Sequence, residues 1–177
     1  IGVHENDGGD SLSTAAIHEV TLPWNADYIT VGDLDGDGDP DVLAAGRADY
    51  VQVWRNDGTA GFTLQPTDTH GFPRLTHPIL GELDDQPGLD VAGIYHTGCH
   101  LLLMSGNGDG TFGTTVSRVL GTGATCWTTE LGTGDMDGDG REDVAISLTN
   151  NGVRLARVND QGALEDFGGL HLSAGLP

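Results

Sequence analysis

Short apolar runs, separated by turns rich in glycine, asparagine and aspartate, make up most of the chain. The runs at 29–32 and 41–45 flank an acidic loop, and the run at 62–64 follows an Asn-Asp-Gly turn. Apolar runs of this length between turn residues predict β-strands rather than helices. The run at 41–45 shows little alternation of apolar and polar residues, which is typical of a strand buried on both faces.

Two sequence markers recur along the chain with nearly the same period. An acidic segment ending in Asp-Val occurs as LDGDGDPDV at 34–42, LDDQPGLDV at 83–91 and MDGDGREDV at 136–144. Its last aspartates, at positions 41, 90 and 143, lie 49 and 53 residues apart by subtraction. A turn of the Asn-Asp-Gly type starts at Asn6, Asn56, Asn107 and Asn159. The chain is therefore built from repeats, and its length counts repeats rather than independent domains.

The repeats predict an all-β protein, a β-propeller of four-stranded antiparallel blades, because four short strands in about 50 residues is typical of a propeller blade. The turn at Asn6 corresponds to the turn before the last strand of a blade. Residues 1–18 are therefore interpreted as the trailing half of a blade, followed by blades at 19–70, 71–121 and 122–177. About three and a half blades do not close a ring, which normally takes four to eight. We expect further chain or other subunits to complete it.

The first and third acidic segments offer oxygen atoms at alternating positions, with glycines where the backbone turns sharply. Such a set of oxygen ligands suits Ca²⁺ rather than softer metals. An EF-hand is excluded, because its twelfth position needs a glutamate between two helices and here falls on Ala44 or Ile146 within a predicted strand. Leaving several carboxylates in one tight loop without a counter-charge would be costly. The predicted metal-binding residues are Asp33, Asp35, Asp37, Asp39, Asp41, Asp135, Asp137, Asp139, Arg141 and Asp143.

The middle acidic segment departs from this pattern. Pro87 replaces the turning glycine, and the sequence around Gly88 is altered. The residues that keep partial ligand character, and that form a weaker candidate metal site, are Glu82, Asp84, Gln86 and Asp90. We therefore expect two calcium ions rather than three.

The pattern GDxDGDGxxDV, followed by a strand and then NDGxxxF, resembles the FG-GAP/VCBS repeat family over essentially the whole chain. This family includes the integrin α-subunit propeller and many microbial surface proteins and lectins. The resemblance implies that each calcium loop joins the first two strands of a blade, with ligands met on the opposite face or between blades. It also implies that Asp39 and Arg141 contribute backbone carbonyls, whereas the other aspartates of the first and third loops contribute carboxylates.

Charge excludes two classes of partner. Acidic residues outnumber basic ones by 27 to 7, and the formal net charge is −20. This charge repels a phosphate backbone and an anionic membrane surface, so no nucleic acid is expected as a partner. No apolar run approaches the ~20 residues that span a bilayer, so no membrane insertion is expected.

The loops at the strand ends opposite the acidic segments combine aromatic and polar side chains. Such a mixture is common in sugar-binding sites, so a pocket for a glycan or protein ligand is one interpretation. Packing of Trp24 and Trp127 between adjacent sheets is the alternative. The candidate ligand-face residues are Trp24, Asp27, Asp49, Tyr50, Arg74, Tyr95, His96 and Trp127.

Two cysteines, Cys99 and Cys126, lack the spacing of a zinc site. Both fall on this same predicted face, so we hypothesise an inter-blade disulfide, which would indicate an oxidising compartment and a secreted or cell-surface protein.

No motif indicates catalysis. The chain lacks a G-x-S-x-G elbow, and its seven histidines do not fall at metal-ligand spacing. The favoured interpretation is a non-catalytic extracellular module for adhesion or for recognition of a glycan or protein. The alternatives are a spacer or assembly domain of a surface fibre or large secreted protein, and a fragment of a propeller-type polysaccharide lyase or hydrolase.

Overall fold

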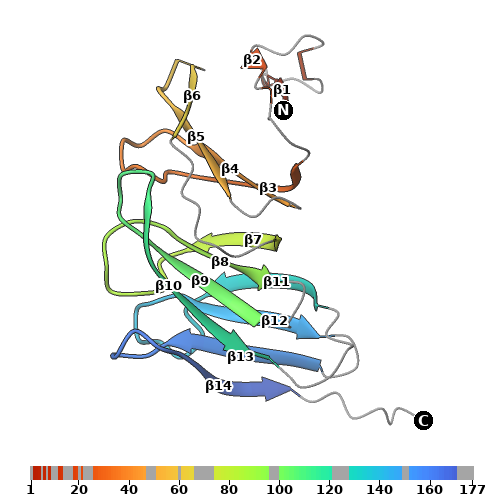
Figure 1. The fold of residues 1–177 in the computed structure, drawn as a ribbon, viewed down its shortest axis with the longest axis vertical. Coiled ribbons are helices and arrows are strands. Elements are labelled where there is room, and N and C mark those ends of the chain that lie inside the picture. The colour runs from red at the N-terminus through yellow and green to blue at the C-terminus, as the bar shows by residue number, and fades with distance from the viewer. Residues whose placement is uncertain are drawn as a thin grey trace, which may run out of the picture.

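The fold consists of β-strands joined by loops (Figure 1). The computed structural model describes residues 26–46, 51–59, 61–65, 74–95, 100–120, 128–148 and 152–170, together with 2–4, 6, 8, 12–13, 18–19 and 21. Among these residues no helix is long and apolar enough to cross a membrane.

Twelve of the strands form three antiparallel sheets of four strands each, which we call blades 1, 2 and 3. In each blade the strands pair in the order of the chain. Blade 1 contains β3 (Ala26–Gly32), β4 (Asp41–Gly46), β5 (Gln52–Asn56) and β6 (Phe62–Leu64). Blade 2 contains β7 (Leu75–Gly81), β8 (Asp90–Tyr95), β9 (His100–Gly106) and β10 (Phe112–Val119). Blade 3 contains β11 (Thr128–Gly134), β12 (Asp143–Leu148), β13 (Gly152–Val158) and β14 (Leu164–Leu170).

A short hairpin precedes blade 1. Strands β1 (Gly2–Val3) and β2 (His18–Glu19) pair antiparallel, and an isolated bridge joins Asn6 to Leu12 between them. The Asn6 side chain accepts a hydrogen bond from Gly8 N at 2.9 Å, which closes the turn at the first Asn-Asp-Gly marker.

The hydrophobic core lies between the blades, in two clusters. One cluster joins blades 1 and 2 and includes Leu43 and Val91, and the other joins blades 2 and 3 and includes Ala92 and Ile146. Neighbouring residues of β8, Val91 and Ala92, thus face different clusters, because successive side chains of a strand point to opposite sides of the sheet. The second strand is buried on both faces, as predicted for 41–45: every residue of β4 is buried.

The first strands of the blades lie side by side, since β7 contacts both β3 and β11. A glycine ends each of them. A Cβ added at Gly32 would lie 2.7 Å from Leu80 Cδ1 of blade 2, and one at Gly81 would lie 3.1 Å from Thr133 Cγ2 of blade 3. At Gly134 no described atom lies within 4 Å of such a Cβ. The glycine of one blade therefore admits the side chain of the next blade.

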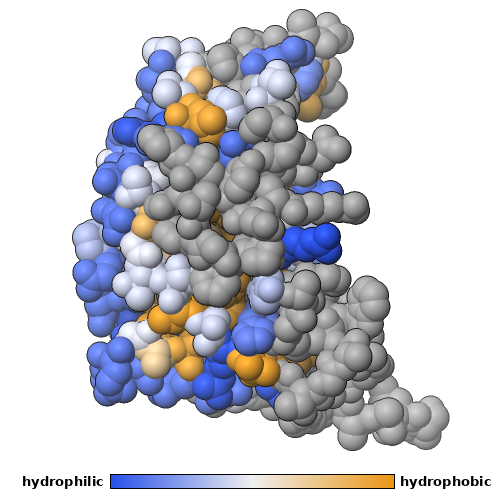
Figure 2. Space-filling view, in the orientation of Figure 1, coloured by the Kyte–Doolittle hydropathy of each residue, from blue (hydrophilic) through white to orange (hydrophobic). Residues whose placement is uncertain are grey.

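The predicted fold class is confirmed: the described residues form three antiparallel four-stranded sheets arranged as propeller blades, and the ring is not closed within this chain. The outer side of blade 1 exposes Ile29 and Val31, which are 54% and 55% accessible. The three acidic loops and the turns that follow β5, β9 and β13 lie at one edge of the molecule, at the left in Figure 1, and this edge is hydrophilic in Figure 2.

Candidate metal centre

The first and third acidic loops fold around their leading aspartate. Asp33 accepts hydrogen bonds from Gly36 N at 2.8 Å and from Gly38 N at 3.0 Å. Asp135 accepts the equivalent bonds from Gly138 N at 2.7 Å and from Gly140 N at 3.1 Å. These glycines all have positive φ, between +78° and +93°, a conformation that L side chains rarely adopt. The glycines of the D-x-D-G-D-G sequence therefore allow a tight backbone turn, whose N–H groups donate to the leading aspartate.

The last aspartate of each loop is buried and ties the loop to the blade. Asp41 accepts from Leu34 N at 2.9 Å and from Asn56 N, at the end of β5, at 2.8 Å. Asp143 accepts from Met136 N at 2.8 Å. Burial raises the pKa of both carboxyls, because an ionised carboxylate loses hydration inside the protein, and neighbouring aspartates add to the shift. A cation beside them would offset this cost.

Carboxylate oxygens converge in the first and third loops. In the first loop, oxygen atoms of Asp33, Asp35 and Asp37 all lie within 4.8 Å of one another. In the third loop a similar group is formed by Asp135, Asp137 and Asp143, so the buried last aspartate takes part in the third loop, whereas its counterpart Asp41 is not in the group of the first loop. Each loop thus brings hard oxygen donors to one point, which fits the ligand preference of calcium. No side-chain oxygen of Asp39 or Asp139 belongs to these groups.

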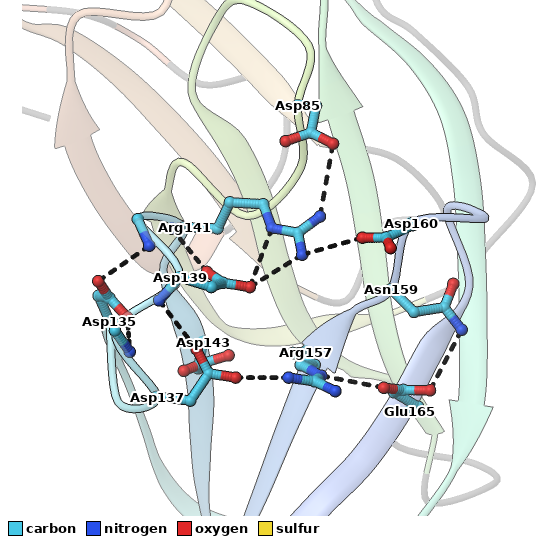
Figure 3. Close-up of polar contacts among 12 residues, drawn as sticks. Asp85, Asp135, Asp137, Asp139, Arg141, Asp143, Arg157, Asn159, Asp160 and Glu165 are labelled. Atoms are coloured by element: carbon cyan, nitrogen blue, oxygen red, sulfur yellow. Dashed lines mark hydrogen bonds and ion pairs between the residues drawn. The ribbon is translucent and has the colours of Figure 1, made fainter.

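An arginine from the third strand of the blade lies against each of these two loops. The Arg55 guanidinium in β5 contacts the Asp35 carboxylate, and the Arg157 guanidinium in β13 donates to Asp137 at 2.5 Å and to Glu165 at 2.9 Å (Figure 3). The Asp35 side chain is only 1% exposed, so Arg55 shields it from solvent. These arginines position one carboxylate of the candidate metal site in each loop and partly balance its charge.

The middle loop has a different arrangement. Asp90 accepts three backbone N–H groups, from Leu83, Asp84 and Gly106 at 2.8 to 3.0 Å. Asp84 accepts from the Ser105 hydroxyl at 2.6 Å instead of from an arginine. All residues of this loop are described, and its carboxylates form no group comparable with those of the first and third loops. Glu82 is exposed, and its backbone is held by blade 3 through a hydrogen bond from Glu142 N to Glu82 O at 2.8 Å.

Arg141 connects the third loop with its surroundings (Figure 3). Its guanidinium donates to Asp139 at 2.8 Å within the loop, and reaches Asp85 of the middle loop and Asp160 of the β13–β14 turn, each at 3.4 Å. The Arg141 side chain lowers the pKa of Asp139 by donating to its ionised carboxylate. Asp139 is therefore engaged by an arginine on the outside of the loop.

The predicted ligand face is described only in part. Asp27 is exposed in β3, Arg74 is exposed just before β7, and Tyr95 is half-buried at the end of β8, where its ring meets His100 edge-on at 6.0 Å. All three lie at strand ends opposite the acidic loops. The remaining predicted residues lie outside the described ranges, as do both cysteines of the hypothesised disulfide: Trp24, Asp49, Tyr50, His96, Trp127, Cys99 and Cys126.

Sequence reasoning missed the arginines and the serine that replaces them. Arg55 and Arg157 lie 20 residues after the aspartates that they contact, and Ser105 lies 21 residues after Asp84. An alignment of the repeats extended beyond the acidic segments would have placed all three in one column. The chain has only seven basic residues, so two of them in one column is an informative signal.

A family model described as FG-GAP-like repeat matches residues 33–85 and 83–146, which together span more than half of the chain. No curated protein and no solved structure matches the chain significantly.

Proposed function

The chain belongs to the FG-GAP-like repeat family, and from this premise we propose that it is a non-catalytic propeller module that holds calcium in its first and third acidic loops. The observation that carries the proposal is the convergence of three carboxylates in each of these loops. Asp33, Asp35 and Asp37 would supply carboxylate oxygens to one ion, joined by Asp41 and by the carbonyl of Asp39.

The third loop would hold the second ion in the same way. Asp135, Asp137 and Asp143 would supply carboxylate oxygens, joined by Asp139 and by the carbonyl of Arg141. A bound calcium ion supplies positive charge that offsets the repulsion within each loop and fixes the bend between the first two strands of the blade. The middle loop, with Gln86 at the position of Asp37 and Asp139, is proposed to remain without a tightly bound ion.

The direct test is the number of calcium ions bound per chain. Isothermal titration of protein stripped with chelator, followed by elemental analysis after dialysis, is expected to give two ions. Magnesium is expected to bind more weakly, because it demands stricter octahedral geometry than a flexible loop provides. A stoichiometry of zero would contradict the metal site, and a stoichiometry of three would contradict the assignment of the middle loop.

We also propose that the module works outside the cell, in adhesion or in recognition of a glycan or protein ligand at the strand ends opposite the acidic loops. Asp27, Arg74 and Tyr95 are the described residues of that face. A glycan array probed with and without chelator tests this role. The proposed disulfide between Cys99 and Cys126 would support an oxidising compartment, and two free thiols in denatured, unreduced protein would contradict it.

An assembly role is the second candidate, and the blade faces favour it. Gly134 has open space where Gly32 and Gly81 meet the next blade, and the opposite side of blade 1 exposes Ile29 and Val31. Exposed apolar residues of this kind commonly mark contact surfaces. We propose blade boundaries at 19–70, 71–121 and 122–177, with residues 1–18 as part of a preceding blade, and further blades or subunits as the partners that complete the ring.

A further inference from the structure

A cavity of about 710 Å³ lies between blades 2 and 3, at the edge that carries the acidic loops. Its apolar floor includes Leu103 and Val158. Its polar walls come from the middle loop, from the third loop through Arg141, and from the turns that follow β9 and β13. The charged side chains of these walls are Asp84, Asp85, Arg141 and Asp160, and Ser105 also lines the cavity.

The equivalent place between blades 1 and 2 is filled by an arginine side chain. Arg55 and Ser105 are equivalent, since each directly precedes the residue whose N–H donates to the buried aspartate of its blade. In blade 1 the Arg55 guanidinium contacts Asp35. In blade 2 the shorter Ser105 contacts Asp84, which is the counterpart of Asp35, and leaves free the volume that a guanidinium would occupy.

The hairpin turns show the same difference. Gly110 donates to Leu34 O at 2.9 Å, and a Cβ at Gly110 would lie 3.4 Å from Arg55 Cδ, so the turn of blade 2 lies against the arginine of blade 1. Gly162 is its counterpart in blade 3. It donates to Asn159 O at 2.8 Å within its own turn, and no described atom lies within 4 Å of a Cβ at that position. The turn of blade 3 therefore stands away from blade 2.

A second substitution explains why this turn stands away. In blade 2, Gly88 lies against the turn, and a Cβ there would be 2.7 Å from Gly108 Cα. Blade 3 has Arg141 at the corresponding position, two residues before the buried aspartate. Its long side chain lies between the loop and the turn and reaches Asp160, and also Asp85 of the middle loop (Figure 3). Two residue changes thus open the cavity.

We propose that this cavity binds a guanidinium group, the arginine side chain of a partner protein. A guanidinium against Asp84 would repeat the contact that Arg55 makes with Asp35 between blades 1 and 2. Three carboxylates face one arginine there, so the walls keep an excess of negative charge. The Asp85 and Asp160 side chains are 73% and 86% exposed, and each lies 3.4 Å from Arg141, so both can accept further donors. The planar guanidinium is suited to such bidentate contacts with carboxylates.

The test uses a blocked tripeptide, acetyl-Gly-Arg-Gly-amide, titrated into the full chain. The citrulline peptide, which has nearly the same shape without the charge, and the lysine peptide serve as comparisons. The arginine peptide is expected to bind at least about tenfold more tightly than either one. Amide chemical shifts are expected to move at Asn107 and Gly162, which line the cavity. The inference does not rest on calcium binding, so the same result is expected with calcium and with chelator while the chain stays folded.

Variants locate the site. Ser105→Arg would place in blade 2 the arginine that blade 1 carries, and is expected to weaken peptide binding at least about tenfold. Asp84→Asn is expected to act in the same direction, because it removes the paired charge. The matched controls are Ser117→Arg on β10 and Glu130→Gln on β11, which change charge equally at exposed positions that do not line the cavity. Both controls are expected to bind within about twofold of the parent chain.

Three outcomes would overturn the proposal. The first is equal binding of the arginine and citrulline peptides, or of the arginine and lysine peptides. The second is unchanged binding by Ser105→Arg when its circular dichroism and melting curve show a folded chain. The third is the absence of shifts at Asn107 and Gly162 in the unmodified chain, and this measurement decides the matter even where a variant fails to fold.

Discussion

The first and third acidic loops differ from the middle loop in how they manage clustered charge. The outer two gather three carboxylates at one point and set an arginine behind one of them. Blade 2 has Ser105 of β9 in place of the arginine and Gln86 in place of one aspartate, and Asp90 accepts three backbone N–H groups, two from the middle loop and one from Gly106 of β9. One scaffold thus supports either a convergent group of carboxylates, the proposed cation site, or a loop held by backbone hydrogen bonds.

This difference shows which part of the repeat is constant. The buried aspartate at the start of the second strand accepts a backbone N–H from its loop in all three blades, through Asp41, Asp90 and Asp143. The constant part is therefore this structural hydrogen bond rather than the whole ligand set. A loop can change its exposed carboxylates and still keep the bend between strands.

Removal of calcium should lower the stability of the folded chain more than any of the substitutions that follow, because it affects the first and third loops together. A ligand that binds only the folded chain at about 100 times its dissociation constant adds about 2.7 kcal/mol per site, so two sites give about 5 kcal/mol. For a chain of this size that corresponds to a fall in Tm of about 10 to 20 °C on chelation. Differential scanning calorimetry with calcium and with chelator measures it. An unchanged Tm would argue against both sites.

Gly88→Ala should destabilise the middle loop by about 3 kcal/mol, in calcium or in chelator. Gly88 has φ of +112°, and its position against Gly108 leaves no room for a methyl group. Gly138→Ala in the third loop is the control, because φ there is +83° and no described atom lies within 4 Å. The control is expected to cost about 1 to 2 kcal/mol from backbone strain alone. If urea denaturation gave the same loss of unfolding free energy for Gly88→Ala and Gly138→Ala, the contact between Gly88 and the turn would contribute nothing to stability.

Asp37→Asn should remove one of the two ions and about half of the calcium-dependent stabilisation free energy, about 2.5 kcal/mol. Gln86→Ala, at the corresponding position of the middle loop, is the matched control and should leave the stoichiometry unchanged. Calorimetric titration of both variants measures this. If Gln86→Ala also lost an ion, the middle loop would be a metal site after all.

Mild acidification should produce the smallest effect, a partial and gradual loss of the calcium-dependent stabilisation. The pKa values of Asp41 and Asp143 are raised in the folded chain by burial. The folded chain therefore holds these protons more tightly, and the stability contributed by the protonated carboxyls is present below pH 3.8 and is lost as pH rises through the folded pKa values. Calcium requires the ionised form, so the difference in Tm between calcium and chelator should narrow as pH falls. A difference independent of pH would contradict this linkage.

The strands and the acidic loops could be predicted because their signals are local. The turn glycines Gly36 and Gly38, the alternating aspartates and the apolar run at 41–45 each specify structure within a few residues. Strands β12 and β13 likewise pair antiparallel, from Leu148 with Gly152 to Val144 with Ala156.

The contacts between blades could not be predicted in the same way. Arg55 meets Asp35, and Arg141 meets Asp85, only because the sheet brings a third strand behind a loop and one blade beside the next. The cavity depends on such contacts in two places at once, at Ser105 and at Arg141, and neither residue is unusual in its local sequence. These contacts and the cavity depend on residues that are distant in the sequence, so local patterns could not predict them.

The glycine that ends the first strand of each blade makes the repeat compatible with its own copy. In each unit the missing side chain of this glycine leaves space for the next unit. One residue earlier, a side chain such as Leu80 or Thr133 packs into the space at the glycine of the preceding unit. A gene segment encoding one such unit can be duplicated in tandem without any change at the joint, since every new copy supplies both halves. Blade number can therefore vary during evolution more readily than blade structure.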